Sequence, residues 1–99
     1  MKKLVTAIAL VMTSGFVLAT DQAVIDQYNK SCVACHASGA AGAPKTGDAD
    51  AWNVRLSEKG METMVANAKN GINAMPPKGM CFDCSDEDFQ ALIEHMMQP

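Results

Sequence analysis

The segment Cys32-Val33-Ala34-Cys35-His36 carries the most specific signal in this chain. Two cysteines separated by two residues and followed directly by histidine are typical of covalent c-type haem attachment. Thiols at this spacing can each add to a vinyl group on neighbouring edges of one porphyrin, and the next residue can bring its imidazole under the iron. We therefore predict that Cys32 and Cys35 attach one haem and that His36 is an axial ligand of its iron.

Two other interpretations of the cysteines remain open from the residues alone. A thioredoxin-like dithiol also has the CxxC spacing, but such pairs follow a strand in a βαβ pattern, and no window here alternates with the period of a strand. A tetrahedral zinc site could combine Cys32 and Cys35 with the second pair, Cys81 and Cys84. Zinc would leave His36 and the Gly- and Ala-rich segment after it without a role, so haem is the favoured interpretation.

The N-terminus predicts a secretory signal peptide over residues 1–19. Lys2 and Lys3 precede an uncharged, mostly apolar run that ends in Val17-Leu18-Ala19, with small side chains where a signal peptidase cleaves. A retained membrane anchor is the alternative, but the run is shorter than the roughly 20 residues that a spanning helix needs. We therefore expect a single domain over residues 20–99 in the periplasm, which is an oxidising compartment.

Length and charge narrow the class of protein further. The chain has 99 residues, with 8 Lys and Arg against 11 Asp and Glu; loss of Lys2 and Lys3 leaves 6 against 11, a net charge of −5. A domain of residues 20–99 is too small for a multidomain enzyme, a transporter or a large receptor. An acidic chain without a basic run is poorly suited to nucleic acid or to an anionic membrane. Its small core would be completed by a covalently attached haem.

Apolar spacing predicts an all-α fold. A first helix over residues 21–31 runs into the cysteine motif, and a capping box of Ser85 and Asp88 opens the last helix. Two helices lie between them, the second with one long apolar stripe. The stripes predicted for the four helices are, in order: Val24, Ile25, Tyr28 and Cys32; Trp52 and Leu56; Met61, Met64, Val65, Ala68 and Ile72; Phe89, Leu92, Ile93 and Met96.

The middle of the chain is predicted to alternate short helices with two ordered loops. Asp48 or Asp50 can cap the second helix, and Gly60 ends it. Residues 37–47 are rich in Gly and Ala and predict a loop whose backbone approaches something closely. Residues 73–79 contain two consecutive prolines and are predicted not to be helical.

More than one residue could supply the second axial ligand of the iron. Met75 lies in the long non-helical loop and is held by Pro76-Pro77, so it is our first choice, with Met80 as the open alternative. His95, the other histidine, is predicted to point away from the apolar stripe of the last helix, toward solvent. The remaining methionines of residues 20–99 lie on stripes or at the chain end and are expected to fill the core or fray: Met61, Met64, Met96 and Met97.

Taken together, the motifs resemble a class I monohaem cytochrome c, and they are most similar to the bacterial cytochrome c5 subgroup. Besides the CxxCH segment, the matching stretches are residues 42–48 followed by Trp52, residues 73–79, and Cys81-Phe82-Asp83-Cys84. The resemblance covers nearly all of residues 20–99. It implies a small all-α fold in which the N- and C-terminal helices pack together and shorter helices and loops wrap one covalently bound haem.

The resemblance also implies roles for individual residues. His36 and Met75 would be the axial ligands, and Cys32 and Cys35 would carry the thioether bonds. The carbonyl of Pro44 would accept a hydrogen bond from the proximal imidazole, which fixes the ring and enriches the ligand.

For the second cysteine pair, the resemblance implies a disulfide between Cys81 and Cys84. An oxidising compartment agrees with such a bridge, which would brace the Met75 loop against the last helix. The alternative is a dithiol switch at a helix N-terminus, where the thiolate is favoured.

Histidine and methionine ligation predicts an electron carrier rather than an enzyme, because it leaves no open position on the iron. We expect a periplasmic protein that moves single electrons between respiratory redox partners through transient contacts, as a monomer or a weak dimer. The acidic net charge would favour partners with a basic patch. The alternatives are a haem-based ligand sensor or weak peroxidase in which the Met75 bond opens, and a thiol–disulfide oxidoreductase that uses Cys81 and Cys84.

Overall fold

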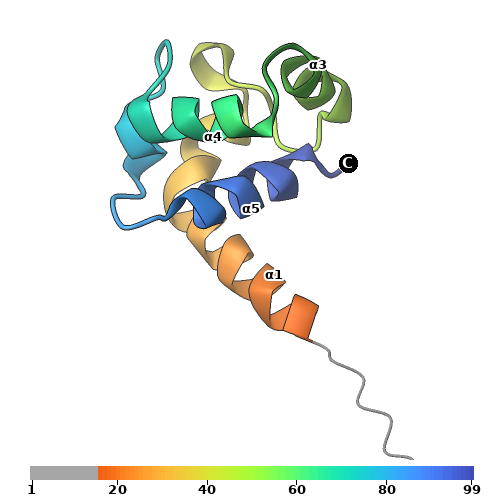
Figure 1. Ribbon diagram of the computed structural model, residues 1–99, viewed down its shortest axis with the longest axis vertical. Helices are drawn as coiled ribbons and strands as arrows, with labels where there is room; N and C mark the ends of the chain where they lie inside the picture. The colour runs from red at the N-terminus through yellow and green to blue at the C-terminus, as the bar shows by residue number, and fades with distance from the viewer. Residues whose placement is uncertain (1–15) are drawn as a thin grey trace, which may run out of the picture.

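The computed structural model describes residues 16–99, and their side chains from Gln22 onward. In this part of the chain the elements are helical, and the β pairing is limited to one isolated bridge between Ile72 and Met75. The all-α prediction is therefore confirmed. The predicted signal peptide lies almost wholly outside the described residues and stays a prediction. The elements in chain order are α1 (Phe16–Gln27), η1 (Tyr28–Cys32), α2 (Val33–His36), η2 (Ala40–Gly42), α3 (Ala49–Lys59), α4 (Met61–Asn70), η3 (Pro77–Met80) and α5 (Asp86–Met97) (Figure 1).

The first helix continues without a break into the cysteine motif. α1 leads into η1, a π-helical turn in which the backbone N–H of Val33 donates to the carbonyl of Tyr28, and α2 follows directly. A π turn holds one more residue than an α turn, and such turns are frequent at functional sites. Figure 1 shows this N-terminal helical segment crossing α5, so the predicted contact between the first and last helices is confirmed.

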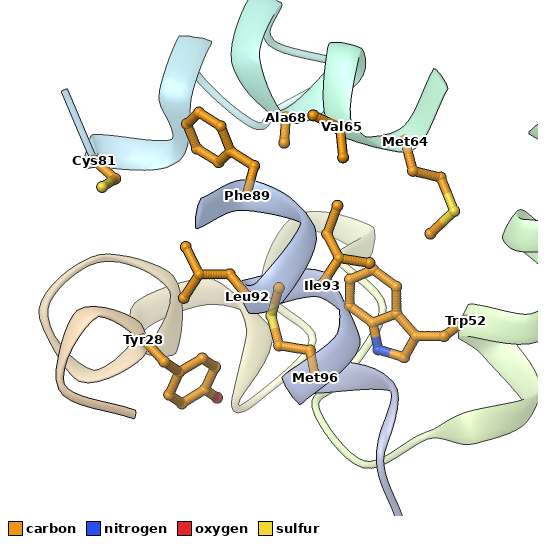
Figure 2. Close-up of a cluster of buried hydrophobic side chains, with 10 residues drawn as sticks. All are labelled: Tyr28, Trp52, Met64, Val65, Ala68, Cys81, Phe89, Leu92, Ile93 and Met96. Atoms are coloured by element: carbon orange, nitrogen blue, oxygen red, sulfur yellow. The ribbon is translucent and has the colours of Figure 1, made fainter. Parts of the chain in front are cut away.

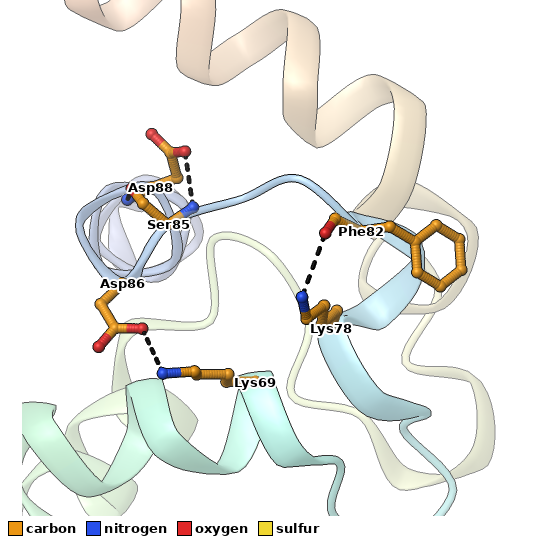
Figure 3. Close-up of polar contacts among 6 residues, drawn as sticks. All are labelled: Lys69, Lys78, Phe82, Ser85, Asp86 and Asp88. Carbon is orange, nitrogen blue, oxygen red and sulfur yellow. Dashed lines mark hydrogen bonds and ion pairs between the residues drawn. The ribbon is translucent and has the colours of Figure 1, made fainter.

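α5 is opened by the predicted capping box. The Ser85 hydroxyl accepts from the backbone N–H of Asp88 at 3.1 Å, and the Asp88 carboxylate accepts from the N–H of Ser85 at 2.9 Å (Figure 3). These bonds satisfy two donors that the first turn of a helix otherwise leaves free. The helix then buries its whole predicted stripe: Phe89, Leu92, Ile93 and Met96.

α3 and α4 follow one another with a sharp turn at Gly60. Asp48, rather than Asp50, is the cap of α3, since its carboxylate accepts from the N–H of Ala51 at 3.2 Å. Gly60 has a φ of +81°, a backbone conformation that favours glycine.

No helix among residues 16–99 is long and apolar enough to cross a membrane.

The stripe predicted for α4 includes one residue, Ile72, that lies beyond the end of the helix. α4 ends at Asn70, and Gly71, with a φ of +92°, takes the chain out of the helix. Ile72 then pairs with Met75 through two backbone hydrogen bonds of 2.8 and 3.1 Å. Ile72 is therefore part of the loop that carries Met75, not of the helix.

The hydrophobic core gathers around α5, between α4 on one side and the N-terminal helical segment on the other (Figure 2). It consists of Tyr28, Trp52, Met64, Val65, Ala68, Cys81, Phe89, Leu92, Ile93 and Met96. Most of these side chains also line a cavity, so the core is built around an open space rather than closed on itself.

Candidate haem site

The cavity has a volume of about 440 Å³ and is enclosed by the CxxCH segment, the Gly- and Ala-rich loop, α3, α4, the Met75 loop and α5. Its lining includes every residue predicted to hold the haem: Cys32, Cys35, His36, Pro44 and Met75. The alternative ligand Met80 lines it as well. Most of the remaining wall is apolar, with Phe89, Leu92, Ile93 and Met96 from α5.

His36 is buried and held from several directions. Its Nδ1 lies 2.8 Å from the carbonyl oxygen of Pro44, which can only accept, so Nδ1 carries a proton and the neutral ring has its lone pair on Nε2. The ring stacks on the indole of Trp52, with centroids 5.6 Å apart, and the carbonyl of His36 accepts from the N–H of Thr46 at 2.8 Å. An imidazole fixed in this way is held in one orientation, and its neutral form has the Nε2 lone pair that binds a metal.

The two thiols of the motif differ in exposure. Cys35 is exposed and Cys32 is half-buried, and both are free cysteines. Burial raises the pKa of the Cys32 thiol from 9.0 to about 11, so before attachment this sulfur is protonated at neutral pH. Neither thiol is engaged in a bridge, so both are free to form thioether bonds.

Met75 and Met80 both line the cavity but differ in how firmly they are held. Met75 is half-buried and packs against the core, and its backbone N–H and carbonyl are both bonded to Ile72. Met80 is 62% exposed. A side chain anchored at its backbone and packed against the core is the better candidate for a fixed ligand, which favours Met75.

His95 does not line the cavity. It is half-buried, and its ring packs edge-on against Tyr28 with centroids 5.2 Å apart. The prediction that His95 faces solvent is therefore wrong, because Tyr28 from the N-terminal segment covers the side of α5 from which His95 projects. Tyr28 is fixed in turn by a hydrogen bond of 2.7 Å to the hydroxyl of Thr46.

Cys81 and Cys84 form a disulfide bond, as expected. Cys81 belongs to the core, where it is 3% exposed. The ammonium of Lys78 donates to the carbonyl of Phe82 at 3.2 Å, which ties the bridged turn to η3, the end of the Met75 loop (Figure 3). Because the sulfurs of Cys81 and Cys84 are joined to each other, they are not available as thiolate ligands for the four-cysteine zinc site, and the structure favours the haem interpretation.

Sequence reasoning missed the charged part of the cavity wall. Arg55, Lys59 and Lys78 line it, and among the side chains that the structure describes no acidic one does. Arg55 is half-buried and donates to the carbonyl of Ala51 at 2.9 Å. The spacing of Trp52, Arg55 and Lys59 by three and four residues places them on one face of α3, which is the signal that could have found them.

Backbone strain is also concentrated at the cavity. Four residues other than glycine have a left-handed backbone among residues 16–99, and all four line the cavity: Ala41, Asn73, Lys78 and Met80. Side chains with a Cβ rarely adopt this conformation, which persists only where the surroundings determine it. The two loops around the cavity are therefore built to a shape that the site, rather than local preference, requires.

The chain is 50% identical to cytochrome c5 of Ectopseudomonas mendocina over 72 residues, which cover 72% of this chain and 83% of the relative. It is 47% identical to cytochrome c5 of Azotobacter vinelandii over 72 residues, which cover 87% of that relative. The chain belongs to the class I cytochromes c.

Solved structures agree with this assignment. A monohaem ferrocytochrome c from Shewanella putrefaciens is 47% identical to the cytochrome, with a TM-score of 0.67, covering 76% of this chain and 91% of that one. Another similar structure is a cytochrome c in a crystal structure of an electron transfer complex with nitrite reductase, with 39% identity and a TM-score of 0.66, covering 76% and 90%. Residues 20–96 also match the family described as cytochrome c oxidase, cbb3-type, subunit III. The cytochrome is thus a monohaem electron carrier with covalently bound haem c, and not an enzyme.

Proposed function

We propose that the cytochrome carries single electrons through a haem attached to Cys32 and Cys35 and ligated by His36 and Met75. The observation that carries the proposal is the hydrogen bond of 2.8 Å between Nδ1 of His36 and the Pro44 carbonyl. It selects, for the neutral ring, the tautomer with its lone pair on Nε2, and the ring lines the same cavity as both thiols and the Met75 thioether. The cavity thus brings together one nitrogen and one thioether that can ligate iron and two thiols that can attach a porphyrin. This combination suits a c-type haem.

The charged wall of the cavity supports the same proposal. Haem carries two carboxylate groups, and the charged side chains that line the cavity are all cationic. Arg55 and Lys59, one turn apart on α3, are suited to pair with these carboxylates, and pairing would also satisfy a guanidinium that is otherwise half-buried beside apolar groups. When bound, the haem supplies a one-electron iron couple, and these residues fix the charge around it.

Ligation by His36 and Met75 suits electron transfer rather than turnover. Both axial positions would be filled by the protein, so a small molecule could reach the iron only by breaking a bond. The backbone bonds of Met75 to Ile72 and the bond of His36 to Pro44 hold the two ligands in place. Ligands that stay in place in both oxidation states keep the structural change on electron transfer small.

The proposed partners are respiratory redox proteins of the periplasm, bound transiently. The similar cytochrome c solved in an electron transfer complex with nitrite reductase supports a reductase as one such partner. The run Asp86-Glu87-Asp88 at the start of α5 is exposed and would attract a basic surface over a long range. The association rate should then fall as ionic strength rises.

Carbon monoxide tests the proposed ligation. Added to the reduced cytochrome at neutral pH, it should leave the optical spectrum unchanged on the time scale of mixing, because Met75 occupies the iron position that it needs. The measurement is a stopped-flow spectrum recorded against reduced protein without gas. An immediate spectral change would contradict the proposal and would favour the ligand sensor or weak peroxidase.

Removing the disulfide tests whether the second cysteine pair has a redox role. In Cys81→Ala/Cys84→Ser the free energy of unfolding should fall by about 2 kcal/mol, the chain-entropy value for so short a loop. Alanine is chosen at position 81 because that residue lies in the core, where a hydroxyl would be unpaired. The rate of electron transfer to a redox partner should not change. A lost rate in a variant that stays folded would instead support a thiol–disulfide oxidoreductase.

A further inference from the structure

The Met75 side chain ends against a residue that has no side chain. A Cβ built on Gly79 would lie 2.8 Å from the terminal methyl carbon Cε of Met75, closer than such atoms approach one another. The Met75 methyl group therefore occupies the space that any larger residue at position 79 would fill. Gly79 also lines the cavity, so this contact belongs to the site itself.

The backbones at both ends of this contact are fixed. Met75 is bonded to Ile72 through its N–H at 2.8 Å and its carbonyl at 3.1 Å. Gly79 donates its N–H to the carbonyl of Pro76 at 3.0 Å. The N–H of Cys81, which forms the disulfide with Cys84, donates to the carbonyl of Lys78 at 2.8 Å. A Cβ at position 79 could therefore be relieved most easily by the torsions of the Met75 side chain.

Those torsions matter because a thioether sulfur has two lone pairs. When one of them binds iron, the methyl group lies to one side of the sulfur; when the other binds, the methyl lies to the opposite side. We propose that Gly79 is a positioning residue, which leaves room for the Met75 methyl on one side and so selects the lone pair that faces the iron. The inference rests on the proposed role of Met75 as a ligand.

Proton NMR of the intact holoprotein tests the contact directly. In the reduced parent protein, the Met75 methyl protons should show a nuclear Overhauser effect to the α protons of Gly79. They should also show one to the haem meso proton on a single side of the sulfur. Absence of the contact to Gly79, in a protein where Met75 is bound, would overturn the inference without any variant.

The variant Gly79→Ala should move the methyl. We expect its Overhauser contact to pass to a different meso proton and the order of the haem methyl resonances in the oxidised protein to change, or the sulfur-to-iron absorption to be lost. Gly60→Ala is the matched control: Gly60 also has a positive φ, of +81°, but nothing lies within 4 Å of its added Cβ. The strain that it introduces is the larger of the two, because Gly60 has a ψ of +158° whereas Gly79 has a φ of +51° and a ψ of +38°, in the left-handed helical region. A folded Gly60→Ala protein should nevertheless keep the parent pattern.

The outcomes separate the two proposals. A folded Gly79→Ala protein with the parent contacts and the parent order of resonances would overturn the role of Gly79 while leaving Met75 as the ligand. A parent protein that lacks the sulfur-to-iron absorption would overturn the ligation itself, and this is seen before any variant is made. A change in Gly60→Ala equal to that in Gly79→Ala would show that strain, not the contact with the methyl, is responsible.

Discussion

Replacing Met75 by alanine should abolish the sulfur-to-iron charge-transfer absorption of the oxidised cytochrome. The reduction potential should fall by on the order of a few tenths of a volt, within the range of about 0.8 V over which axial ligands set haem potentials. A thioether raises the potential relative to nitrogen or thiolate ligands, and alanine has no atom that can take its place. Optical spectra and a redox titration of purified Met75→Ala measure the two effects.

The largest effect should be at the iron, because the backbone pairing that shapes the loop does not involve the Met75 side chain. The pairing of residues 72 and 75 uses backbone atoms, which alanine keeps. The prolines that follow and the disulfide between Cys81 and Cys84 are also unchanged. The reduced variant should therefore bind carbon monoxide at once, whereas the parent protein should not.

Met80→Ala is the matched control, since it removes the other methionine of the same loop that lines the cavity. Met80 is 62% exposed, and its loss should leave both the absorption and the potential near their parent values. If Met80→Ala removes the absorption while Met75→Ala retains it, the assignment of the ligand is reversed.

The helices of this protein could be predicted from the sequence because their signals are local. The capping box at Ser85 and Asp88, the cap at Asp48 and the break at Gly60 each act within one turn of a helix. The apolar stripe of α5 needs only the period of a helix to be recognised. The CxxCH segment is equally local, since its chemistry depends on a fixed spacing.

The cavity wall could not be predicted in the same way, because its shape depends on a loop pairing and on backbone conformations that neither residue preference nor helical period indicates. Ile72 continues the stripe of α4 but is drawn into the loop by its pairing with Met75. Asn73 and Lys78 adopt a left-handed backbone that local preference would not predict. The positive charge of the wall could not be predicted from the net charge of the chain, which is acidic. A charged helical face is usually exposed to solvent, so Arg55 and Lys59 were not expected to line a cavity.

A chain without the attachment cysteines is expected to contain no covalent haem and to lose most of its folded structure. In Cys32→Ala/Cys35→Ala, the mass of the denatured protein should equal that of the bare polypeptide, and the helical circular dichroism should fall sharply. Denaturing mass spectrometry and far-ultraviolet spectra of the purified protein measure the two effects. We further expect the parent mass to be that of residues 20–99 plus one haem, since the signal peptide is proposed to be removed.

The loss of fold follows from the position of the cavity within the core. At about 24 cal/mol per Å³ of cavity, a space of about 440 Å³ corresponds to an upper limit on the order of 10 kcal/mol. Small domains are stable by only about 5–15 kcal/mol in total, so a group that fills the cavity should supply a large share of the stability of this fold. The haem would thus act as the centre of the core as well as the redox group.

The double variant Cys81→Ala/Cys84→Ser provides the control for this experiment, because it removes the same number of cysteines from the same protein. Its sulfurs are joined in a disulfide and do not line the cavity, so it should keep its haem and most of its helical signal. If Cys32→Ala/Cys35→Ala is still recovered folded with haem bound through a covalent bond, the thioether assignment is wrong. If instead the disulfide variant loses its haem, the attachment depends on the second pair. In that case the CxxCH segment alone would not account for the chemistry of this protein.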